Sequence, residues 1–423
     1  MITLPRLRNN SEEVIARLAI RGLDAKSMVN EVLTLDEKVR TLKTELETLQ
    51  AESNANAASI GRLMKEGNID EANKAKEASA QSKGIIKNLE SELANLESQL
   101  KEALVVLPNT PDFSVPTGKN SEDNKIEGVF GTMPQIPEDS LPHWDLAKKY
   151  DLIDFDLGVK ITGAGFPVYK GKGAIIQRAL IQFFLNEAGR MGYTEIQPPL
   201  MVNSDSAFGT GQLPDKEGQM YYVGEDDLYL IPTAEVPVTN IFRNVLYKSD
   251  QFPIKYCGYT PCFRREAGSY GAHVRGLNRL HQFDKVEIVQ LVHPEKSYET
   301  LTEMSEYVQS LLKKLGLHYR VLLLCGGDMG FTSAKTYDME VWSPAQKMWL
   351  ECSSVSNFET YQTHRLECRF KDENGKSQFP HSLNGSALAL PRILASILET
   401  YQTPEGIVVP EVLRPYTGFD IIK

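Results

Sequence analysis

The hydrophobic pattern is strongest in the N-terminal part of the chain, where it repeats in heptads. A first series alternates steps of four and three positions: Met28, Val32, Leu35, Val39, Leu42, Leu46 and Leu49. A second series does the same: Ile86, Leu89, Leu93, Leu96, Leu100, Ala103 and Leu107. Gly61, Gly67 and Asn68 lie between the two series and indicate a turn. Two heptad helices joined by one turn predict an antiparallel helical hairpin over about 27–107, with helices of roughly 33 residues and about 50 Å.

The sequence on either side of this hairpin carries boundary signals. Asn10, followed by a serine and two acids, indicates a helix start, so residues 1–26 are interpreted as a short capped segment. Pro108 ends the second heptad helix. The segment 108–140 holds five prolines, and we therefore interpret it as a linker. The first domain is thus expected over 1–107.

From about residue 141 onward the pattern mixes helix and strand. Apolar residues at helical spacing predict an amphipathic helix over 174–191. Further helices are expected at 234–247, 294–315 and 386–400, and a strand-like run with two prolines at 193–199 is expected at a sheet edge. Other strands are expected at 229–232, 257–265, 282–290, 338–342 and 349–353. Strands without regular βαβ alternation favour an α+β fold with an antiparallel sheet over 141–423.

A polar hairpin within this second region is the strongest candidate for a site. It consists of Phe263-Arg264-Arg265-Glu266, the strand 281–287 and a loop with Gly268, Tyr270, Gly271, His273, Arg275 and Gly276. Alternating apolar and charged residues predict that one face of the hairpin is turned into a polar cavity. Arginine binds carboxylate or phosphate oxygens and glutamate can bind an amine, so the face suits a substrate with such groups. A surface hairpin with paired charges is the alternative.

Composition narrows the partners and the compartment. With 423 residues, 41% hydrophobic and 24% charged, the chain is typical of a globular protein with two or three domains. Its net charge of −10 means that a nucleic acid would have to bind a local basic patch. The sequence contains no run of about 18 apolar residues, so no membrane span is predicted. Five cysteines without a CxxC pair indicate free thiols, a cytoplasmic location and no structural zinc site.

The charge of the predicted arm is mixed. Residues 27–107 hold 10 Lys and Arg against 14 Asp and Glu. Positive charge is relatively concentrated in the distal half, at Arg62, Lys65, Lys74, Lys76, Lys83 and Lys87. From the heptads alone, a dimerisation or spacer element is the simplest interpretation. Neither a Walker A sequence nor a GxGxxG motif after a strand occurs, so nucleotide binding of the P-loop or Rossmann type is not supported.

Three segments of the second region together resemble the motifs of class II aminoacyl-tRNA synthetases. Residues 192–199, ending in Pro199, look like motif 1, residues 263–287 look like motif 2, and residues 385–392 look like motif 3. Within this class, the chain resembles the bacterial-type seryl-tRNA synthetases over essentially its whole length. The heptad arm, the strings Thr233-Ala234-Glu235 and Leu383-Asn384-Gly385-Ser386, and the segment 351–357 add to this resemblance.

The resemblance implies a domain plan and an activity. An N-terminal tRNA-binding domain with a coiled-coil arm would span 1–107, and a class II catalytic domain, an antiparallel sheet flanked by helices, would span 141–423. The implied ligase activates L-serine with ATP to seryl-adenylate, releases pyrophosphate and transfers the seryl group to tRNA-Ser. The family implies a homodimer, because motif 1 lies at a two-fold interface. Whether tRNA-Sec is also an acceptor is left open.

The same resemblance assigns an ATP site. The expected residues are Arg264, Arg265, Glu266, Phe283, Glu351, Cys352, Ser353, Ser354 and Arg392. Arg264 would bridge the serine carboxylate and the α-phosphate, and Arg392 would hold the γ-phosphate, so these two are the expected catalytic residues. Phe283 would stack under the purine, with Arg392 above. Glu351 and Ser354 are the expected Mg²⁺ ligands, because Mg²⁺ takes few carboxylates together with phosphate oxygens.

The resemblance also assigns the serine and tRNA contacts. The expected serine-binding residues are Thr233, Ala234, Glu235, Arg264, Glu287, Asn384 and Ser386. Glu287 and Ser386 would read the ammonium and the hydroxyl, and a site built around a hydroxyl rejects alanine strongly. An ordinary helix N-cap is the alternative for Thr233. The six basic residues of the distal arm would contact the tRNA, with recognition by shape and backbone.

Departures from the family pattern and two other functions stay open at this point. Motif 3 usually has glycine where Pro391 stands, and proline removes a backbone donor unless it begins a helix. One alternative function is a paralogue that ligates an amino acid to a carrier protein, although such relatives typically lack the arm. The other is a non-catalytic class II-like binding protein, which the presence of Arg264, Glu266, Glu351 and Arg392 disfavours.

Overall fold

The computed structural model describes residues 1–215, 217–266 and 275–423. These residues form two compact units, Met1–Ala19 with Leu23–Pro108 and Ile20–Gly22 with Asn109–Lys423. The hairpin-loop residues that the sequence singled out, Gly268, Tyr270, Gly271 and His273, lie outside the described residues.

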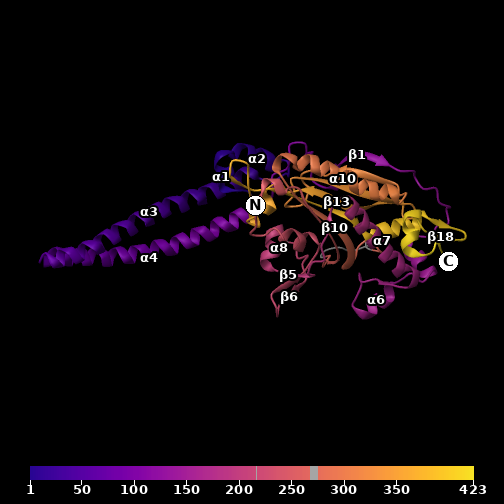
Figure 1. The fold of residues 1–423 in the computed structure, drawn as a ribbon, viewed down its shortest axis with the longest axis horizontal. Coiled ribbons are helices and arrows are strands. Elements are labelled where there is room, and N and C mark those ends of the chain that lie inside the picture. Colours follow the sequence, from indigo (N-terminus) through magenta and orange to yellow (C-terminus); the bar gives the residue numbers. More distant parts are fainter. Residues whose placement is uncertain (216, 267–274) are drawn as a thin grey trace. The chain divides into compact units, whose positions relative to one another are not determined.

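The first unit is helical and contains a long two-helix hairpin (Figure 1). Its helices are α1 Leu4–Asn9, α2 Ser11–Ala19, α3 Ala25–Lys65 and α4 Ile69–Val105. With 41 and 37 residues, α3 and α4 are longer than predicted, because both continue past the large apolar residues into alanine- and serine-rich turns. Gly67 makes the turn with a φ of +81°, whereas Gly61 lies inside α3 and does not interrupt it.

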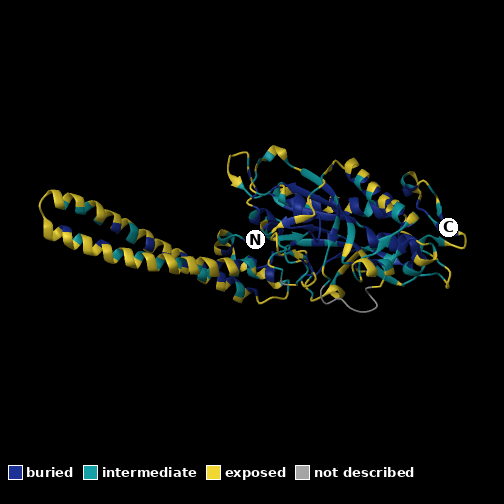
Figure 2. Cartoon of the chain, turned by 90° about the horizontal axis from the view of Figure 1, so that it is seen from below, coloured by how far each residue is buried: buried dark blue, intermediate teal, exposed yellow. Residues whose placement is uncertain are grey.

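The contact between α3 and α4 follows the predicted heptads. Among the predicted heptad positions within these helices, Val32, Val39, Leu42, Leu46 and Leu100 are buried and the others are of intermediate burial. Figure 2 shows exposed residues along the outer faces of both helices and buried or intermediate residues along the inner faces. The Lys43 Nζ to Glu97 Oε1 ion pair of 2.7 Å joins the two helices. Gln50 also donates to Glu90 across the pair, so the antiparallel register is fixed at two levels.

One buried position of α3 is charged. Asp36 is 2% exposed and accepts hydrogen bonds from Arg8 Nε at 2.7 Å and from Arg8 Nη2 at 2.6 Å. Arg40 Nε adds a third bond at 3.1 Å. The hydrogen bond from Arg8 outweighs burial and lowers the pKa of Asp36. The bidentate pair ties α1 to the base of the arm, which hydrophobic periodicity alone does not predict.

The second unit is built on an eight-stranded sheet. Its strands in spatial order are β1 Lys125–Phe130, β11 Tyr319–Leu323, β12 Lys335–Ser343, β13 Met348–Asn357, β16 His381–Ala389, β10 Gln282–Val292, β9 Ile254–Phe263 and β4 Thr194–Glu195. All neighbouring pairs are antiparallel except β4 with β9. The predicted α+β class with an antiparallel sheet is therefore confirmed.

Three long helices cover this sheet. They are α7 Gly171–Arg190, α10 Ser297–Lys314 and α12 Leu390–Thr400. Their apolar faces meet the strands in one large core, in which Phe184, Ile288, Val341 and Leu394 are at most 1% exposed. The amphipathic patterns at 174–191 and 294–315 correspond to α7 and α10, because each places one apolar face against the sheet.

Smaller elements connect or border the main sheet. The helices are α5 His143–Lys149, α6 Phe155–Ile161, α8 Ser204–Thr210, α9 Glu235–Asn240, α11 Tyr361–Arg365 and α13 Arg414–Thr417. The strands are β2 Ile153–Asp154, β3 Val168–Tyr169, β5 Met201–Asn203, β6 Tyr222–Val223, β7 Leu228–Leu230, β8 Leu246–Lys248, β14 Arg369–Lys371, β15 Ser377–Gln378, β17 Gln402–Thr403, β18 Gly406–Val408 and β19 Ile421–Ile422. None of the helices among the described residues is long and apolar enough to cross a membrane.

Three sequence interpretations differ from the structure. The segment 108–140 includes β1, which pairs with β11, because its prolines lie at the two ends and leave 125–130 free to enter the sheet. The helix expected at 234–247 ends at Asn240, and the chain then forms β8 beside β14. The helix expected from 386 begins at Leu390, because 386–389 pair with β10 as the end of β16.

Candidate functional site

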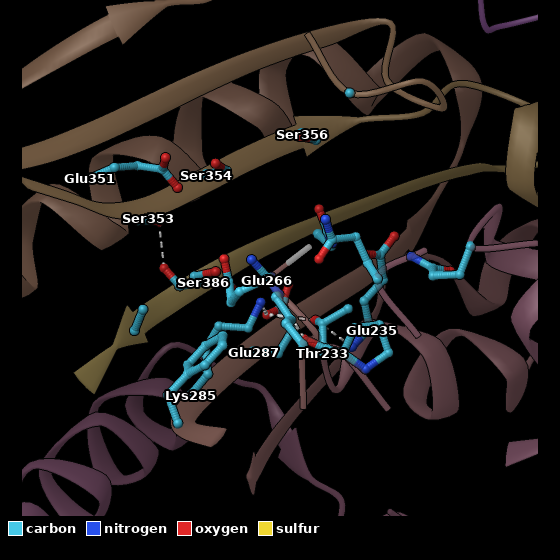
Figure 3. A pocket seen from close by; sticks show the side chains of 18 of the residues that line it. Thr233, Glu235, Glu266, Lys285, Glu287, Glu351, Ser353, Ser354, Ser356 and Ser386 are labelled. Atoms are coloured by element: carbon cyan, nitrogen blue, oxygen red, sulfur yellow. Dashed lines mark hydrogen bonds and ion pairs between the residues drawn. The ribbon is translucent and has the colours of Figure 1, made fainter. Parts of the chain in front are cut away.

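A cavity of about 610 Å³ in the second unit contains most of the predicted site. The predicted residues that line it are Thr233, Glu235, Arg264, Glu266, Phe283, Glu287, Glu351, Cys352, Ser353, Ser354, Asn384, Ser386 and Arg392. They come from β10, β13 and β16, from the chain that follows β7 and β9, and from the first turn of α12. Figure 3 shows Glu351 with Ser354 on one strand, and Lys285, Glu287, Thr233 and Glu235 gathered in another part of the cavity.

Two predicted residues do not line the cavity. Ala234 is fully buried and belongs to a hydrophobic cluster with Val238 and Phe242. Arg265 is exposed, and its backbone N–H donates to the carbonyl of Gln219. Arg265 follows the end of β9 at Phe263, and this backbone contact accompanies a side chain that does not line the cavity.

Strand pairing places the charged residues of the cavity side by side. Phe283, Lys285 and Glu287 occupy alternate positions of β10 and therefore share one face of the sheet. On the neighbouring strand β16, Ser386 is directly opposite Glu287. The Ser353 hydroxyl on β13 donates to the Ser386 carbonyl at 2.6 Å, which ties the third strand to the same floor.

A buried ion pair forms the acidic part of the site. Lys285 Nζ lies 2.5 Å from Glu287 Oε2, and the two residues are 6% and 1% exposed. The Thr233 hydroxyl also reaches Glu287 Oε2 at 3.4 Å. Burying a charge is costly unless it is paired, and Lys285 provides that partner for Glu287 beneath the cavity. Lys285 was absent from the sequence prediction, although the alternation with Phe283 and Glu287 along one strand could have identified it.

Glu235 places a second carboxyl beside this pair. Gln362 Nε2 donates to Glu235 Oε1 at 2.6 Å, and Gln362 itself is fully buried. Burial and the nearby charge of Glu287 raise the pKa of Glu235 to about 7. Two carboxylates against the one ammonium of Lys285 leave this part of the cavity short of positive charge. An ammonium group of a ligand would supply it.

Arg264 lines the same cavity as the acidic part. Its Nε donates to the carbonyl of Pro232 at 3.3 Å, and its guanidinium carbon lies 5.2 Å from the centre of the Phe283 ring. The backbone contact uses one donor of the guanidinium and leaves others for a carboxylate or phosphate. One face of Phe283 is thus occupied by Arg264, which the sequence did not predict.

Arg392 defines a second cationic position in the cavity. Its Nε donates to the carbonyl of Asn278 at 3.0 Å, and its Nη1 donates to the carbonyl of Glu351 at 2.7 Å. Nη1 is also 3.9 Å from the Glu351 carboxylate. Pro391 is the second residue of α12, where the first-turn N–H has no helical partner, so the proline is compatible with this position of Arg392.

Two more lining residues were missed, both on the segment that leads back into β10. Arg279 Nε forms an ion pair with Glu266, which offsets the charge of that predicted ATP residue. Asn278 is 5% exposed and, within the described part of the chain, its Oδ1 has no hydrogen-bond partner. Neither residue lies in a predicted strand of the polar hairpin. They reach the cavity because the segment that precedes β10 is folded against it.

The residues around Glu351 fit a hard divalent cation bound together with phosphate oxygens. The Glu351 side chain is 51% exposed, and Ser354 lines the same cavity. Asp338 is buried opposite Ser354, and burial and the charge of Glu351 raise its pKa well above the ordinary range. Among the described residues, no cluster of three or more His, Cys, Asp or Glu could hold a metal ion without other ligands. The oxygen donors of Glu351 and Ser354 suit Mg²⁺ bound together with a nucleotide.

Comparison with known families divides the chain into the same two parts. Residues 1–111 match the model of the seryl-tRNA synthetase N-terminal domain. Residues 221–401 match the model of the tRNA synthetase class II core domain for G, H, P, S and T. The second match contains every predicted ATP and serine residue.

Individual relatives extend over the whole length. The serine–tRNA ligase of Salinibacter ruber is 49% identical over 421 residues, with 99% of this chain and 98% of the relative covered. The crystal structure of seryl-tRNA synthetase from Pyrococcus horikoshii complexed with ATP superposes with a TM-score of 0.92 at 33% identity, covering 100% and 99% of the two chains. The cytoplasmic serine–tRNA ligase of Naegleria fowleri, in complex with AMP, gives a TM-score of 0.88 at 28% identity, again covering 100% and 99%. The chain therefore belongs to the seryl-tRNA synthetase family.

Proposed function

We propose that this chain is a serine–tRNA ligase that makes seryl-adenylate in the cavity and passes the seryl group to tRNA-Ser. One observation carries the proposal: a buried acidic cluster, Arg264 and a second arginine, Arg392, all line one cavity. Serine has an ammonium and a carboxylate, and ATP has a chain of phosphates. The acids suit the ammonium, and the two arginines suit the carboxylate and the phosphates of the adenylate that joins serine to AMP.

Adenylate formation requires charge neutralisation more than proton transfer. The serine carboxylate attacks the α-phosphate, pyrophosphate leaves, and negative charge accumulates on the phosphate oxygens. The free donors of Arg264 would bind both the carboxylate and the α-phosphate and hold them in line. Its anchored Nε, at the carbonyl of Pro232, fixes the guanidinium before the substrates arrive.

The leaving pyrophosphate would be bound at the other end of the cavity. Arg392, already held by the carbonyls of Asn278 and Glu351, would contact the γ-phosphate. When Mg²⁺ is bound with ATP, it supplies charge neutralisation and geometry to the phosphates. Glu351 and Ser354 are the side chains that would hold it.

Serine selection would depend on the acidic cluster. Glu287 and Glu235 would bind the ammonium, and Thr233, Asn384 and Ser386 offer polar groups near the hydroxyl. A ligand without the hydroxyl would leave such buried groups unpaired, so we expect alanine to be rejected. Ala234, buried in the neighbouring cluster, would contribute only its backbone position, and Arg265 would not contact ATP in this arrangement.

The first unit would bind the tRNA. The six basic residues of the distal arm, Arg62, Lys65, Lys74, Lys76, Lys83 and Lys87, are all exposed on α3 and α4. Exposed cations on a long narrow rod suit recognition of RNA by backbone and shape. We further propose a homodimer, as motif 1 of this class implies, and a cytoplasmic location.

Serine-dependent exchange of labelled pyrophosphate into ATP tests the proposal and separates it from its alternatives. We expect exchange with serine and far weaker exchange with alanine or glycine. Preference for alanine or glycine would select the carrier-protein ligase instead. Absence of exchange with every amino acid would indicate a non-catalytic binding protein. Charging of tRNA-Ser with labelled serine then tests the second step.

A further inference from the structure

A buried histidine outside the cavity contacts the segment that carries Asn278 and Arg279. His143, the first residue of α5, is fully buried, and its Nε2 accepts the backbone N–H of Leu277 at 2.8 Å. A Cβ on the adjacent Gly276, whose φ is +65°, would clash with His143 Nε2. Arg275 lies with its guanidinium carbon 4.6 Å from the centre of the Trp144 ring. Three successive residues of this segment therefore rest on the first turn of α5.

The partners of the His143 ring define its proton. A backbone N–H can only donate, so Nε2 must be the acceptor and the proton must be on Nδ1. Nδ1 lies 2.8 Å from Glu399 Oε1, which accepts the hydrogen bond from Nδ1–H. Burial alone would raise the pKa of Glu399, but hydrogen bonds from His143 and Ser343 lower it, so the carboxylate is ionised at neutral pH. Glu399 also caps the start of α5, accepting the His143 N–H at 3.0 Å.

The same network extends to the arginine of the cavity. The carbonyl of Asn278 accepts Arg392 Nε, and Asn278 Nδ2 donates to Gln346 Oε1 at 2.7 Å. Gln346 in turn donates to Glu399 Oε1 at 3.2 Å. Glu399 is near the C-terminal end of α12, and Arg392 is in the first turn of that helix. His143, the returning segment and both ends of α12 thus form a closed hydrogen-bonded circuit.

We propose that His143 is a positioning residue for ATP: its neutral ring holds residues 275–278 in place and, through the Asn278 carbonyl, orients the guanidinium of Arg392 toward the phosphates. The inference deepens the proposed function, because it concerns the nucleotide end of the same cavity. It assigns no contact between His143 and ATP. The serine end, formed by Glu287, Glu235 and Thr233, lies outside this circuit.

Two substitutions separate the positioning role from simple stability. An asparagine amide reaches the place of Nδ1, so His143→Asn can keep a donor to Glu399 but loses the acceptor for Leu277. A glutamine amide reaches the place of Nε2, so His143→Gln can keep the acceptor for Leu277. Each variant loses one hydrogen bond of a buried group, and both should lower Tm by a similar amount, about 2–4 °C.

Calorimetric titration with a non-hydrolysable ATP analogue, and separately with serine, gives the decisive readout on the full-length protein. We expect His143→Asn to weaken binding of the analogue about five- to tenfold, the usual net effect of one hydrogen bond, and to change serine affinity less than about twofold. His143→Gln should restore most of the nucleotide affinity at the same reduced Tm. Equal weakening in both variants, equal weakening for serine, or no weakening would overturn the inference.

Gln346→Met provides a second variant if the histidine changes prevent folding. Gln346 is only partly buried in the turn between β12 and β13, and methionine removes its bond to Asn278. We expect the same selective loss of affinity for the ATP analogue. Unchanged affinity would contradict the circuit. Because these readouts are binding constants, they are independent of whether the wild-type protein activates serine, which the exchange assay tests separately.

Discussion

At the residue scale, the main feature of the site is two buried carboxyl groups, those of Glu287 and Glu235, which have different partners. The Glu287 carboxylate has Lys285 as a partner at 2.5 Å, whereas the Glu235 carboxyl has only the neutral amide of Gln362 as a hydrogen-bond partner among the described side chains. Burial and the nearby charge of Glu287 raise the pKa of Glu235 to about 7. The nearby charges of Lys285 and Arg264 lower the pKa of Glu235, but they do not cancel the effect of burial and of Glu287.

Arg264 provides the sharpest mutational prediction. Arg264→Ala removes the guanidinium that would bind carboxylate and α-phosphate in the transition state. We expect a loss of at least about 3 kcal/mol in kcat/KM for pyrophosphate exchange, a factor above roughly 100. Arg369→Ala, which removes an exposed guanidinium on β14, serves as the matched control. A rate for Arg264→Ala close to that of the control would remove Arg264 from its assigned role.

The pKa of Glu235 predicts a pH dependence for serine binding. Below about pH 7 the carboxyl is protonated and cannot attract the serine ammonium, which stays charged over this range. The KM for serine in pyrophosphate exchange should therefore fall several-fold as the pH rises from 6 to 8. Glu235→Gln should raise that KM and flatten its pH profile. A profile that stays steep in the variant would assign the titration to another group.

Stability gives an independent check on Glu235, with a definite sign. Between the ordinary glutamate pKa and about 7, the folded protein binds this proton more tightly than the unfolded chain does, so the carboxyl lowers stability as the pH rises through that window. Glu235→Gln keeps an acceptor for Gln362 and removes this penalty. At pH 8 the free energy of unfolding of the variant should exceed that of the wild type by no more than about 3 kcal/mol, and near pH 4 the two should be equal. Thermal melting of both proteins at the two pH values measures the difference. A variant that melts lower at pH 8 would contradict the shift.

At the element scale, the two helices of the arm and their contact were predicted because a heptad pattern is local. Whether a residue faces the other helix depends on its spacing of three and four positions from other apolar residues, and Leu42 and Leu46 are buried as expected. Helix ends near small residues were not predicted, because alanine and serine extend α3 and α4 without an apolar signal. Asp36 is buried although it is charged, because Arg8 on another helix pairs with it.

The catalytic unit shows where sequence patterns become insufficient. Ser386 was expected to begin a helix, but pairing with Glu287 extends β16 to Ala389 and delays the helix. Pairing between strands 100 residues apart overrides local propensity in such cases. The cavity residues that lie in the motifs of the family were predicted. Gln362 on α11 and His143 on α5 contact residues of the cavity or of its rim, and no local pattern in the sequence identifies either.

The arm makes a separable prediction for tRNA charging. Leu46 and Ala94 lie at the same level of the hairpin, since Lys43 pairs with Glu97 and Gln50 with Glu90. Replacing residues 47–93 by a short glycine-rich turn keeps Asp36 with its arginines and removes all six distal basic residues. Charging of tRNA-Ser should fall by more than about tenfold, while pyrophosphate exchange stays within about twofold. Loss of both activities together would show that the two units do not divide the work as proposed.

At the scale of the whole molecule, the account predicts a two-fold assembly. Sedimentation equilibrium should give twice the 47.4 kDa of the chain at micromolar concentration. The arm truncation described above should remain dimeric, because motif 1 belongs to the second unit. A monomer with full exchange activity would contradict the proposed assembly and leave the chemistry of the cavity intact.

The central claim is that one cavity holds ATP and serine with Arg264 between them. A crystal structure of the protein soaked with a non-hydrolysable seryl-adenylate analogue tests it most directly. We predict that the ammonium lies against Glu287 and Glu235, that the phosphate mimic is bound by Arg264, and that the adenine is stacked beside Phe283. A cavity without the analogue at saturating concentration, or an analogue bound with its amino-acid part at Arg392, would contradict the account.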